Sequence, residues 1–377
     1  MRDAVIVDAV RSPIGRRRGA LSGIHPADLS AHVLESLVER TGLDPAAVDD
    51  VVWGCVSQTS EQAGNVARTA ILAAGWPESV PGTTVTRACG SSQQALSMAA
   101  AAVVSGQQDI VVAGGVESMS RVPMGSAAPN GESQPPTVLD RYGVDRFSQG
   151  IGAEMMAQKW SLSRTTLDTF SLRSHELAAQ AADAGAFDGQ LAPIPGVLEG
   201  DEGIRRGGTP ESMAALKPAF RDDGVIHAGN ASQISDGAAA LLVMGSDTAA
   251  QHGLTPLARV HTAVVAGDDP VIMLTGPIAA TAKALDRSGL AIGDIGAFEI
   301  NEAFAPVPLA WQIETGADPD RVNPLGGAIA VGHPLGGSGA ILMTRLVHHM
   351  RDNGIRYGLQ SMCEAGGMAN ATIVELL

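Results

Sequence analysis

An internal repeat relates the first and last parts of the chain and limits the folds that it can adopt. An apolar run at 51–56 is followed about 35 residues later by Cys89, and an apolar run at 297–300 is followed at about the same distance by His333. We expect each of these two residues to open a helix. The repeat therefore predicts two halves of one topology, packed face to face, with Cys89 and His333 at equivalent helix N-termini around a shared centre.

The two halves continue in a similar way after these helices. The segment VVAGGVES follows the first helix, with an expected turn at Gly114-Gly115. The segment LQSMCEAGG follows the second, with an expected turn at Gly366-Gly367. The second segment also places Cys363 in a loop directly after an apolar strand.

Strand and helix patterns alternate along both halves. Short β-branched runs at 5–7, 51–53 and 110–113 alternate with alanine-rich helical patterns at 29–40 and 93–105. This alternation predicts an α/β fold with largely buried strands.

Two turn-rich clusters, at 128–137 and 200–212, interrupt the alternation. We expect them to belong to a loop or lid subdomain that is inserted into the first half. The predicted division is an N-terminal half at 1–117, completed by about 233–254, a loop subdomain at 118–232, and a C-terminal half at 255–377.

The composition argues against several classes of function. The 377 residues carry a formal net charge of -15 and no basic run longer than Arg16-Arg17-Arg18, so we expect no nucleic-acid partner. No run of about 18 apolar residues occurs, so we expect no membrane span. The three cysteines lie far apart, which favours a reducing compartment over a disulfide framework and predicts a cytoplasmic protein.

Cys89 stands in the stretch TRACGSSQQA, at the start of a predicted helix. The positive end of a helix favours the thiolate, which is the reactive form of cysteine, and Gly90 would let a substrate approach the backbone. The alternative is a small buried hydrophobic residue, which is the usual role of an isolated cysteine. For Cys55, which has no comparable setting, we expect that structural role.

Three further loops carry groups that suit nucleophilic catalysis. His333, held in GHPLGGSG, would take the proton of a thiol and remain beside the thiolate as an imidazolium, although a lone histidine is more often a core or surface residue. Asn301, in NEAFA, would orient a water or a carbonyl, with a helix cap as the alternative. Cys363 would act as a general acid and base, while neighbouring N–H groups stabilise an oxyanion.

Taken in order, CGSS, NEAFA, GHPLGGSG and the late CEAGG loop resemble the motifs of the thiolases, the acetyl-CoA acyltransferases of the thiolase superfamily. The resemblance covers essentially the whole chain, including RSPIGRRRGALSG, GGVESMSRVP and GNASQISDGAAA. It implies the thiolase fold, a layered αβαβα core of two similar halves, and an acyltransferase that forms homodimers or homotetramers.

The resemblance also implies a role for each loop. Cys89 becomes acylated, His333 activates it, and Cys363 moves protons to and from the substrate α-carbon and the CoA thiol. Asn301 holds a water that forms one oxyanion hole with His333, and the N–H groups of Cys89 and Ala365 form the other. In thiolysis Cys89 attacks the 3-keto carbonyl of a 3-ketoacyl-CoA, the C2–C3 bond breaks, and free CoA collects the acyl group.

Coenzyme A is, by the same resemblance, a co-substrate, with no permanently bound cofactor and no metal. Ser232 matches a serine that contacts pantetheine. The residues that match the lining of the CoA or acyl pocket, for which core packing is the competing explanation, are Phe220, Met273 and Phe304. Partners for the CoA phosphates are expected among residues whose alternative is an exposed loop, namely Arg205, Arg206 and Lys217.

The chain departs from the family pattern at several positions. Thr86 stands in place of a common Asn, and Ser92 and Ala365 each stand in place of a common Gly. A left-handed backbone at Ala365 would be strained by the side chain. Ser148 and Gln149 stand where members with small biosynthetic substrates tend to have His and Met, which favours a different acyl group.

These features favour a degradative 3-ketoacyl-CoA thiolase of fatty acid metabolism, acting in β-oxidation. The alternatives are a biosynthetic acetoacetyl-CoA thiolase that condenses two acetyl-CoA, a thiolase of sterol or branched acyl breakdown, and a CoA-binding thiolase-like protein without catalysis. Cys363 argues against a decarboxylating ketoacyl synthase, which usually employs two histidines or His and Asn. Retention of all four polar groups argues against loss of catalysis.

Overall fold

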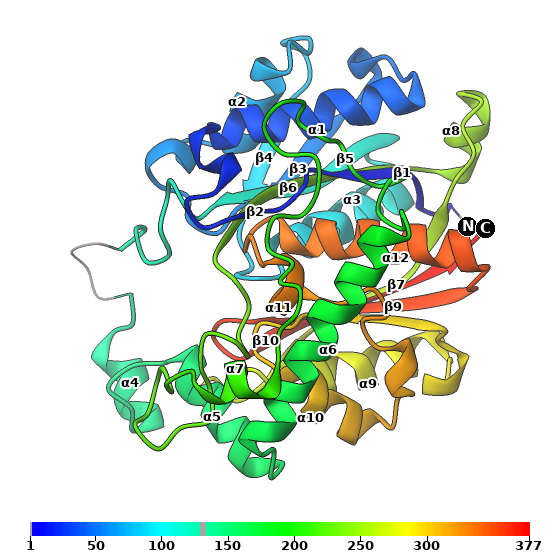
Figure 1. Ribbon diagram of the computed structural model, residues 1–377. Coiled ribbons are helices and arrows are strands. Elements are labelled where there is room, and N and C mark those ends of the chain that lie inside the picture. The colour runs from blue at the N-terminus through cyan, green and yellow to red at the C-terminus, as the bar shows by residue number, and fades with distance from the viewer. Residues whose placement is uncertain (1, 129–132) are drawn as a thin grey trace.

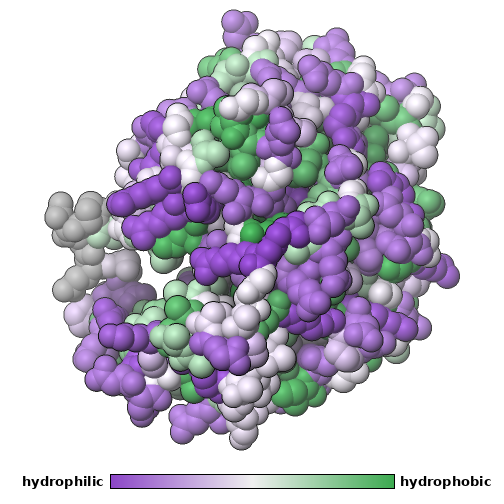
Figure 2. Space-filling view, in the orientation of Figure 1, coloured by the Kyte–Doolittle hydropathy of each residue, from purple (hydrophilic) through white to green (hydrophobic). Residues whose placement is uncertain are grey.

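The computed structural model describes residues 2–128 and 133–377. Part of the predicted turn-rich cluster at 128–137 therefore lies outside the described residues. No helix within the described ranges is long and apolar enough to cross a membrane. Hydrophilic residues cover most of the face seen in Figure 2, and hydrophobic residues occur there in separate patches.

Within the described residues, ten strands form one sheet in the order β4-β3-β5-β6-β1-β7-β10-β9-β8, with β2 paired to β6. Every residue of β5 and β6 is buried, as expected for strands that are covered on both faces. The strands are β1 (Val5–Arg11), β2 (Gly15–Arg16), β3 (Asp50–Gly54), β4 (Gly82–Val85), β5 (Ile110–Ser118), β6 (Ser235–Met244), β7 (Ala258–Gly267), β8 (Ala297–Ile300), β9 (Tyr357–Glu364) and β10 (Met368–Leu376).

The predicted repeat is present in the strand order. The series β3-β5-β6-β1 of the first half recurs as β8-β9-β10-β7 in the second. In each series the first pair is parallel and the next two pairs are antiparallel. The halves join where β1 pairs with β7, with Val5 opposite Arg259.

Helices complete a five-layer arrangement (Figure 1). Helices α1 and α2 cover the outer face of the first half, α9 covers the outer face of the second with α10 beside it, and α3 and α12 lie between the halves. The helices are α1 (Pro26–Thr41), α2 (Val66–Ala73), α3 (Ser91–Ser105), α4 (Pro136–Tyr142), α5 (Gln149–Lys159), α6 (Arg164–Asp183), α7 (Pro210–Ala214), α8 (Ser246–Gln251), α9 (Gly276–Ser288), α10 (Pro306–Thr315), α11 (Ala328–Val331) and α12 (Ser338–Asn353).

The central position of α12 explains its burial. Every residue from Ser338 to His348 is buried, because the helix contacts strands of both halves and α3. A helix that is buried all round belongs in a core and not on a surface. The predicted layered αβαβα fold is therefore confirmed, and the layers bring the loops before α3 and α12 into the interior.

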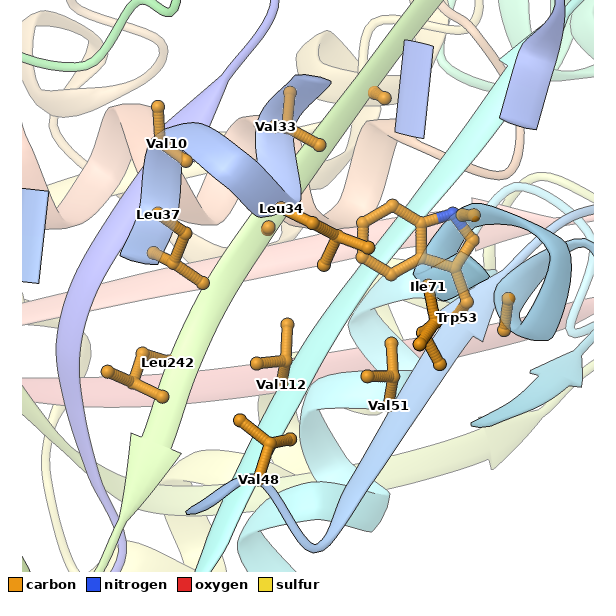
Figure 3. Close-up of a cluster of buried hydrophobic side chains, with 14 of the residues drawn as sticks. Val10, Val33, Leu34, Leu37, Val48, Val51, Trp53, Ile71, Val112 and Leu242 are labelled. Atoms are coloured by element: carbon orange, nitrogen blue, oxygen red, sulfur yellow. The ribbon is translucent and has the colours of Figure 1, made fainter. Parts of the chain in front are cut away.

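A hydrophobic cluster packs α1 onto the first half of the sheet (Figure 3). Leu29, Val33 and Leu37 recur every four residues, so they form one stripe along the helix. The indole N–H of the buried Trp53 donates to the Ser30 hydroxyl at 3.2 Å, so its polar atom is satisfied. Other members of the cluster in Figure 3 are Val10, Leu34, Val48, Val51, Ile71, Val112 and Leu242.

The predicted turn at Gly114-Gly115 is wrong, because both residues lie inside β5. These glycines serve close packing instead. A Cβ at Gly114 would overlap the Trp53 ring, and one at Gly115 would stand 2.7 Å from the carbonyl oxygen of Gly54. The other predicted turn is present, since Gly366 and Gly367 connect β9 to β10 with φ of 86° and 73°.

The segment at 118–232 holds α4 to α7, with α6 running for 20 residues. Helix α6 packs against α11, and α5 packs against α10, so this segment lies along the second half (Figure 1). Such regular helices were not expected from its turn-rich composition. The predicted division into an N-terminal half, a loop subdomain and a C-terminal half stays a proposal.

Candidate active site

Asn301 lies between two of the other predicted catalytic residues. It directly follows β8, and its backbone N–H donates to the carbonyl of Ser361 at 3.1 Å, which fixes the start of the loop. Its side-chain Nδ2 lies 3.4 Å from His333 Nε2 and 3.9 Å from Cys363 Sγ. The amide is therefore a donor held between an imidazole and a thiol.

Cys363 is the penultimate residue of β9 and precedes the tight turn to β10. Burial raises the pKa of its thiol to about 12, while the hydrogen bond from Asn301 opposes the rise. The group is therefore a neutral thiol at pH 7. A neutral thiol with a donor beside its sulfur has a proton to give and a means of stabilising the thiolate that remains.

The predicted position of His333 at the start of a helix is wrong. It lies in the loop between α11 and α12, and α12 begins only at Ser338. Proline at 334 has no N–H, and Gly332 has a φ of 110°, so the chain makes an irregular loop before it becomes helical. His333 still contacts the helix start through Ser338.

Ser338 determines which nitrogen of the His333 ring carries the proton. Its hydroxyl donates to the Pro334 carbonyl at 2.9 Å, so it accepts from Nδ1–H of His333 at 2.6 Å. The Nε2 atom then carries the lone pair, which faces the Asn301 amide at 3.4 Å. Burial lowers the pKa of His333 to about 4, so the ring is neutral and can accept a proton.

The Cys89 loop is a tight turn that leads into α3. Ala88 has a left-handed φ of 45°, an uncommon conformation for a residue with a side chain. The turn is held by Ser91, whose hydroxyl donates to the Ala88 carbonyl at 2.6 Å and accepts from the Arg87 N–H at 2.9 Å. Cys89 belongs to the same buried cluster as Leu335 of the His333 loop and Met362 beside Cys363.

The burial of Cys89 opposes the thiolate that the helix N-terminus was expected to favour. Burial, followed by the influence of Cys363 and Glu364, raises the pKa of Cys89 well above its ordinary value. Desolvation disfavours the charged form because the thiol has almost no contact with water. The resting site therefore holds a neutral thiol and a neutral imidazole, and proton transfer must accompany nucleophilic attack.

Two family descriptions match this chain and together span nearly all of it. "Thiolase, N-terminal domain" matches residues 4–247, and "Thiolase, C-terminal domain" matches residues 254–376. The chain belongs to the thiolase family. The predicted family and the predicted class of enzyme, an acyltransferase, are confirmed.

Relatives of this thiolase match it over nearly their full length. A steroid 3-ketoacyl-CoA thiolase from Mycobacterium tuberculosis is 51% identical, covering 100% of this chain and 95% of the relative. A 3-ketoacyl-CoA thiolase from Erwinia tasmaniensis is 44% identical, with 100% of both chains covered. The crystal structure of the Bacillus anthracis acetyl-CoA acetyltransferase has a TM-score of 0.92 and 39% identity over 100% of this chain and 99% of that one.

The residues predicted to line the acyl or pantetheine pocket surround the NEAFA loop of the thiolase. Met273 and Phe304 share a buried cluster with Cys363. Phe220, which is 41% exposed, lies edge-on to Phe304 with ring centroids 5.9 Å apart. Ser232 is tied to the same loop by a hydrogen bond from its N–H to the Ala303 carbonyl at 2.9 Å. Apolar side chains thus connect the exposed Phe220 with the buried cluster that contains Cys363.

A cavity of about 700 Å³ lies between α6 and the loop that carries the candidate phosphate ligands. Arg205 and Arg206 both line it, but the Arg206 guanidinium is paired with Asp183 at 2.7 Å. Lys217 is exposed and lies outside the lining. The catalytic candidates are also outside the lining, so this cavity is separate from the thiol site.

Ala365 does not adopt the left-handed backbone in which its side chain would be strained. The left-handed conformations of its turn belong to Gly366 and Gly367. The N–H group that the oxyanion would use is therefore available without the strain of a left-handed backbone at Ala365. The described residues hold no cluster of three or more His, Cys, Asp and Glu side chains that could bind a metal ion.

Sequence reasoning missed Ser338, Glu117 and Glu364. The carboxylate of Glu117 accepts from the N–H groups of Ser57 and Gly336 at 3.0 and 2.9 Å, and so fixes the His333 loop against β5. The sequence signal that could have indicated Glu117 is a charged residue near the end of the apolar run that forms β5. Cys55, predicted to be structural, is buried in the first-half core and its pKa is raised by burial.

We expect the substitution Ser338→Ala to lower kcat by about ten- to a hundredfold and leave KM nearly unchanged. Without the hydroxyl, Nδ1 loses its acceptor and the ring can take the tautomer that protonates Nε2. Steady-state kinetics measure kcat and KM separately. Ser30→Ala, which removes a buried hydroxyl far from the site, serves as control, and a kcat for Ser338→Ala within twofold of the parent contradicts the assigned role.

Proposed function

We propose that this thiolase cleaves a 3-ketoacyl-CoA with CoA to acetyl-CoA and a shortened acyl-CoA, through an acyl intermediate on Cys89. The observation that carries the proposal is the Asn301 amide, which lies 3.4 Å from the basic nitrogen of His333 and 3.9 Å from the Cys363 sulfur. One site thus combines a base for the nucleophile with a separate proton donor, as Claisen cleavage requires.

The first half-reaction starts from the neutral Cys89 thiol and the neutral His333 imidazole. His333 Nε2 takes the Cys89 proton as the sulfur attacks the C3 carbonyl. The resulting oxyanion is stabilised by the N–H donors of Cys89 and Ala365, or by the water that Asn301 would hold. The tetrahedral adduct then collapses and the C2–C3 bond breaks. Its electron pair passes to C2 of the departing acetyl-CoA enolate, which takes its proton from the Cys363 thiol.

The second half-reaction regenerates both thiols. The Cys363 thiolate takes the proton of incoming CoA, and the CoA sulfur attacks the acyl group on Cys89. Collapse of this second adduct releases the acyl-CoA, and the Cys89 thiolate recovers its proton from the His333 imidazolium. Two cysteines are required because one stays acylated while the other transfers protons.

Coenzyme A enters as co-substrate in this proposal, and no resident cofactor takes part. Its pantetheine arm would pass Ser232, Phe220 and Phe304, and Met273 would pack against the acyl group. Arg205 and Lys217 would meet the phosphates, whereas the guanidinium of Arg206 is already paired with Asp183. A homodimer or homotetramer in the cytoplasm remains part of the proposal.

A ring-bearing or branched acyl group is the second candidate for the substrate. The 51% identical relative is named a steroid 3-ketoacyl-CoA thiolase. Ser148 stands where members with small biosynthetic substrates tend to have His. Its hydroxyl caps α5 by accepting from the Ile151 N–H at 3.4 Å.

Thiolysis of a panel of 3-ketoacyl-CoAs tests the function. The panel contains straight short, straight long, branched and ring-bearing acyl groups, and consumption of the CoA thiol is measured. We expect cleavage, with kcat/KM for bulky chains at least about tenfold above that for acetoacetyl-CoA. Preference for acetoacetyl-CoA would favour the biosynthetic alternative, and CoA binding without cleavage of any substrate would establish a non-catalytic protein.

A further inference from the structure

Glu364 lies between two groups of the proposed site, Cys363 and the N–H of Ala365. It is the last residue of β9 and its side chain is fully buried. The carboxylate lies against Gly90, the residue after Cys89, where an added Cβ would overlap it. Gly90 therefore makes room for Glu364, a packing reason for the glycine that the sequence did not indicate.

The carboxylate has no polar partner in its pocket. Neither Glu364 oxygen has a hydrogen-bond partner among the described residues. Asn370, which also faces Gly90, directs its Nδ2 to the Gly90 carbonyl at 3.1 Å. Arg87 is the facing cation, but its guanidinium lies against the Met368 sulfur at 3.9 Å and its Nε is unpartnered in the described chain.

An unpaired buried carboxylate is costly, so the neutral acid is favoured. Burial raises the pKa of Glu364 to about 8, and Arg87 opposes the rise. The other titratable groups that act on this environment are the thiols of Cys89 and Cys363, with Glu117 also acting on Cys89. Glu364 is therefore neutral at pH 7 and ionised above about pH 8.

We propose that Glu364 is a positioning residue that links the Cys89 and Cys363 loops, and that its ionisation suppresses formation of the Cys89 thiolate. The inference rests on the proposed role of Cys89 as nucleophile. The neutral acid supports Gly90 without adding charge beside the thiol or beside the oxyanion donors. The carboxylate places a like charge next to both, so it opposes the thiolate and the tetrahedral oxyanion.

The sign of the pH dependence follows from this arrangement. Below pH 8 Glu364 is neutral and Cys89 ionises more as the pH rises. Above pH 8 the new carboxylate charge raises the thiol pKa further, so the gain in thiolate flattens. A glutamine at this position keeps the shape and the contact with Gly90 but never acquires the charge, so the flattening disappears.

Alkylation of Cys89 by iodoacetamide tests the coupling without any substrate. Rates between pH 6 and pH 10 are read by mass spectrometry of the peptide that contains Cys89. Glu364→Gln is expected to match the parent within twofold at pH 6 to 7 and to react about tenfold faster at pH 10. Glu299→Gln, which neutralises another buried carboxyl that faces Arg345, is expected to leave the Cys89 profile unchanged.

The substitution Arg87→Met is a second test of the coupling between Glu364 and Cys89. Because Arg87 favours the ionised form of Glu364, its removal is expected to move the flattening of the Cys89 profile to higher pH. Coinciding profiles for the parent and Glu364→Gln, or a shift to lower pH in Arg87→Met, overturn the proposal. Since alkylation needs no turnover, these outcomes are distinguishable from failure of the proposed thiolysis.

Discussion

Cys89→Ala is expected to lower thiolysis by at least about a thousandfold and to abolish the acyl-enzyme. The reason is specific to the position, because Cys89 is the thiol that shares a buried cluster with Leu335 of the His333 loop. Neither Asn301 nor Cys363 can replace it, because an amide is not a nucleophile and Cys363 is needed as the separate proton donor. Steady-state thiolysis and intact-protein mass spectrometry measure the two effects.

Cys55→Ala is the matched control for this substitution. Cys55 is equally buried but lies in the first-half core, with α1 and β3. It is expected to keep kcat within about threefold of the parent and to lose only stability, because a small cavity is created. Normal thiolysis by the Cys89→Ala variant would show that the nucleophile has been assigned wrongly.

Cys363→Ala is expected to separate acylation from turnover. Cys89 and His333 remain, so the variant still acquires an acyl group, but slowly. Turnover falls by about a thousandfold or more, because no group protonates the enolate or takes the CoA proton. A rapid-mixing assay that compares the first acylation with the steady state measures the difference, and a steady-state rate within tenfold of the parent contradicts the role of Cys363.

The sequence indicated the layout of the fold because its signals are local. The apolar run at 297–300 coincides with β8, and the helix expected after Cys89 begins at Ser91. The repeat also placed Cys89 and His333 in opposite halves that meet in the interior. Such features depend on side-chain patterns within short windows, which a single sequence contains.

The remaining features depend on contacts between distant segments. Gly114 was read as a turn because its partner, the Trp53 ring, belongs to another strand. The helix start at Cys89 could be predicted from the sequence, whereas the burial that raises the pKa of its thiol results from packing of both halves. Glu364 carried no recognisable signal, since its meeting with Gly90 joins residues that lie far apart along the chain.

Cys89 is expected to carry the acyl group. The direct measurement is mass spectrometry of the cysteine peptides after the protein is mixed with a 3-ketoacyl-CoA in the absence of free CoA. We expect the mass of the shortened acyl group on the peptide containing Cys89, with acetyl-CoA released in equal amount. An acyl mass on Cys363 or Cys55, or release of acetyl-CoA with no acylated peptide, would contradict it.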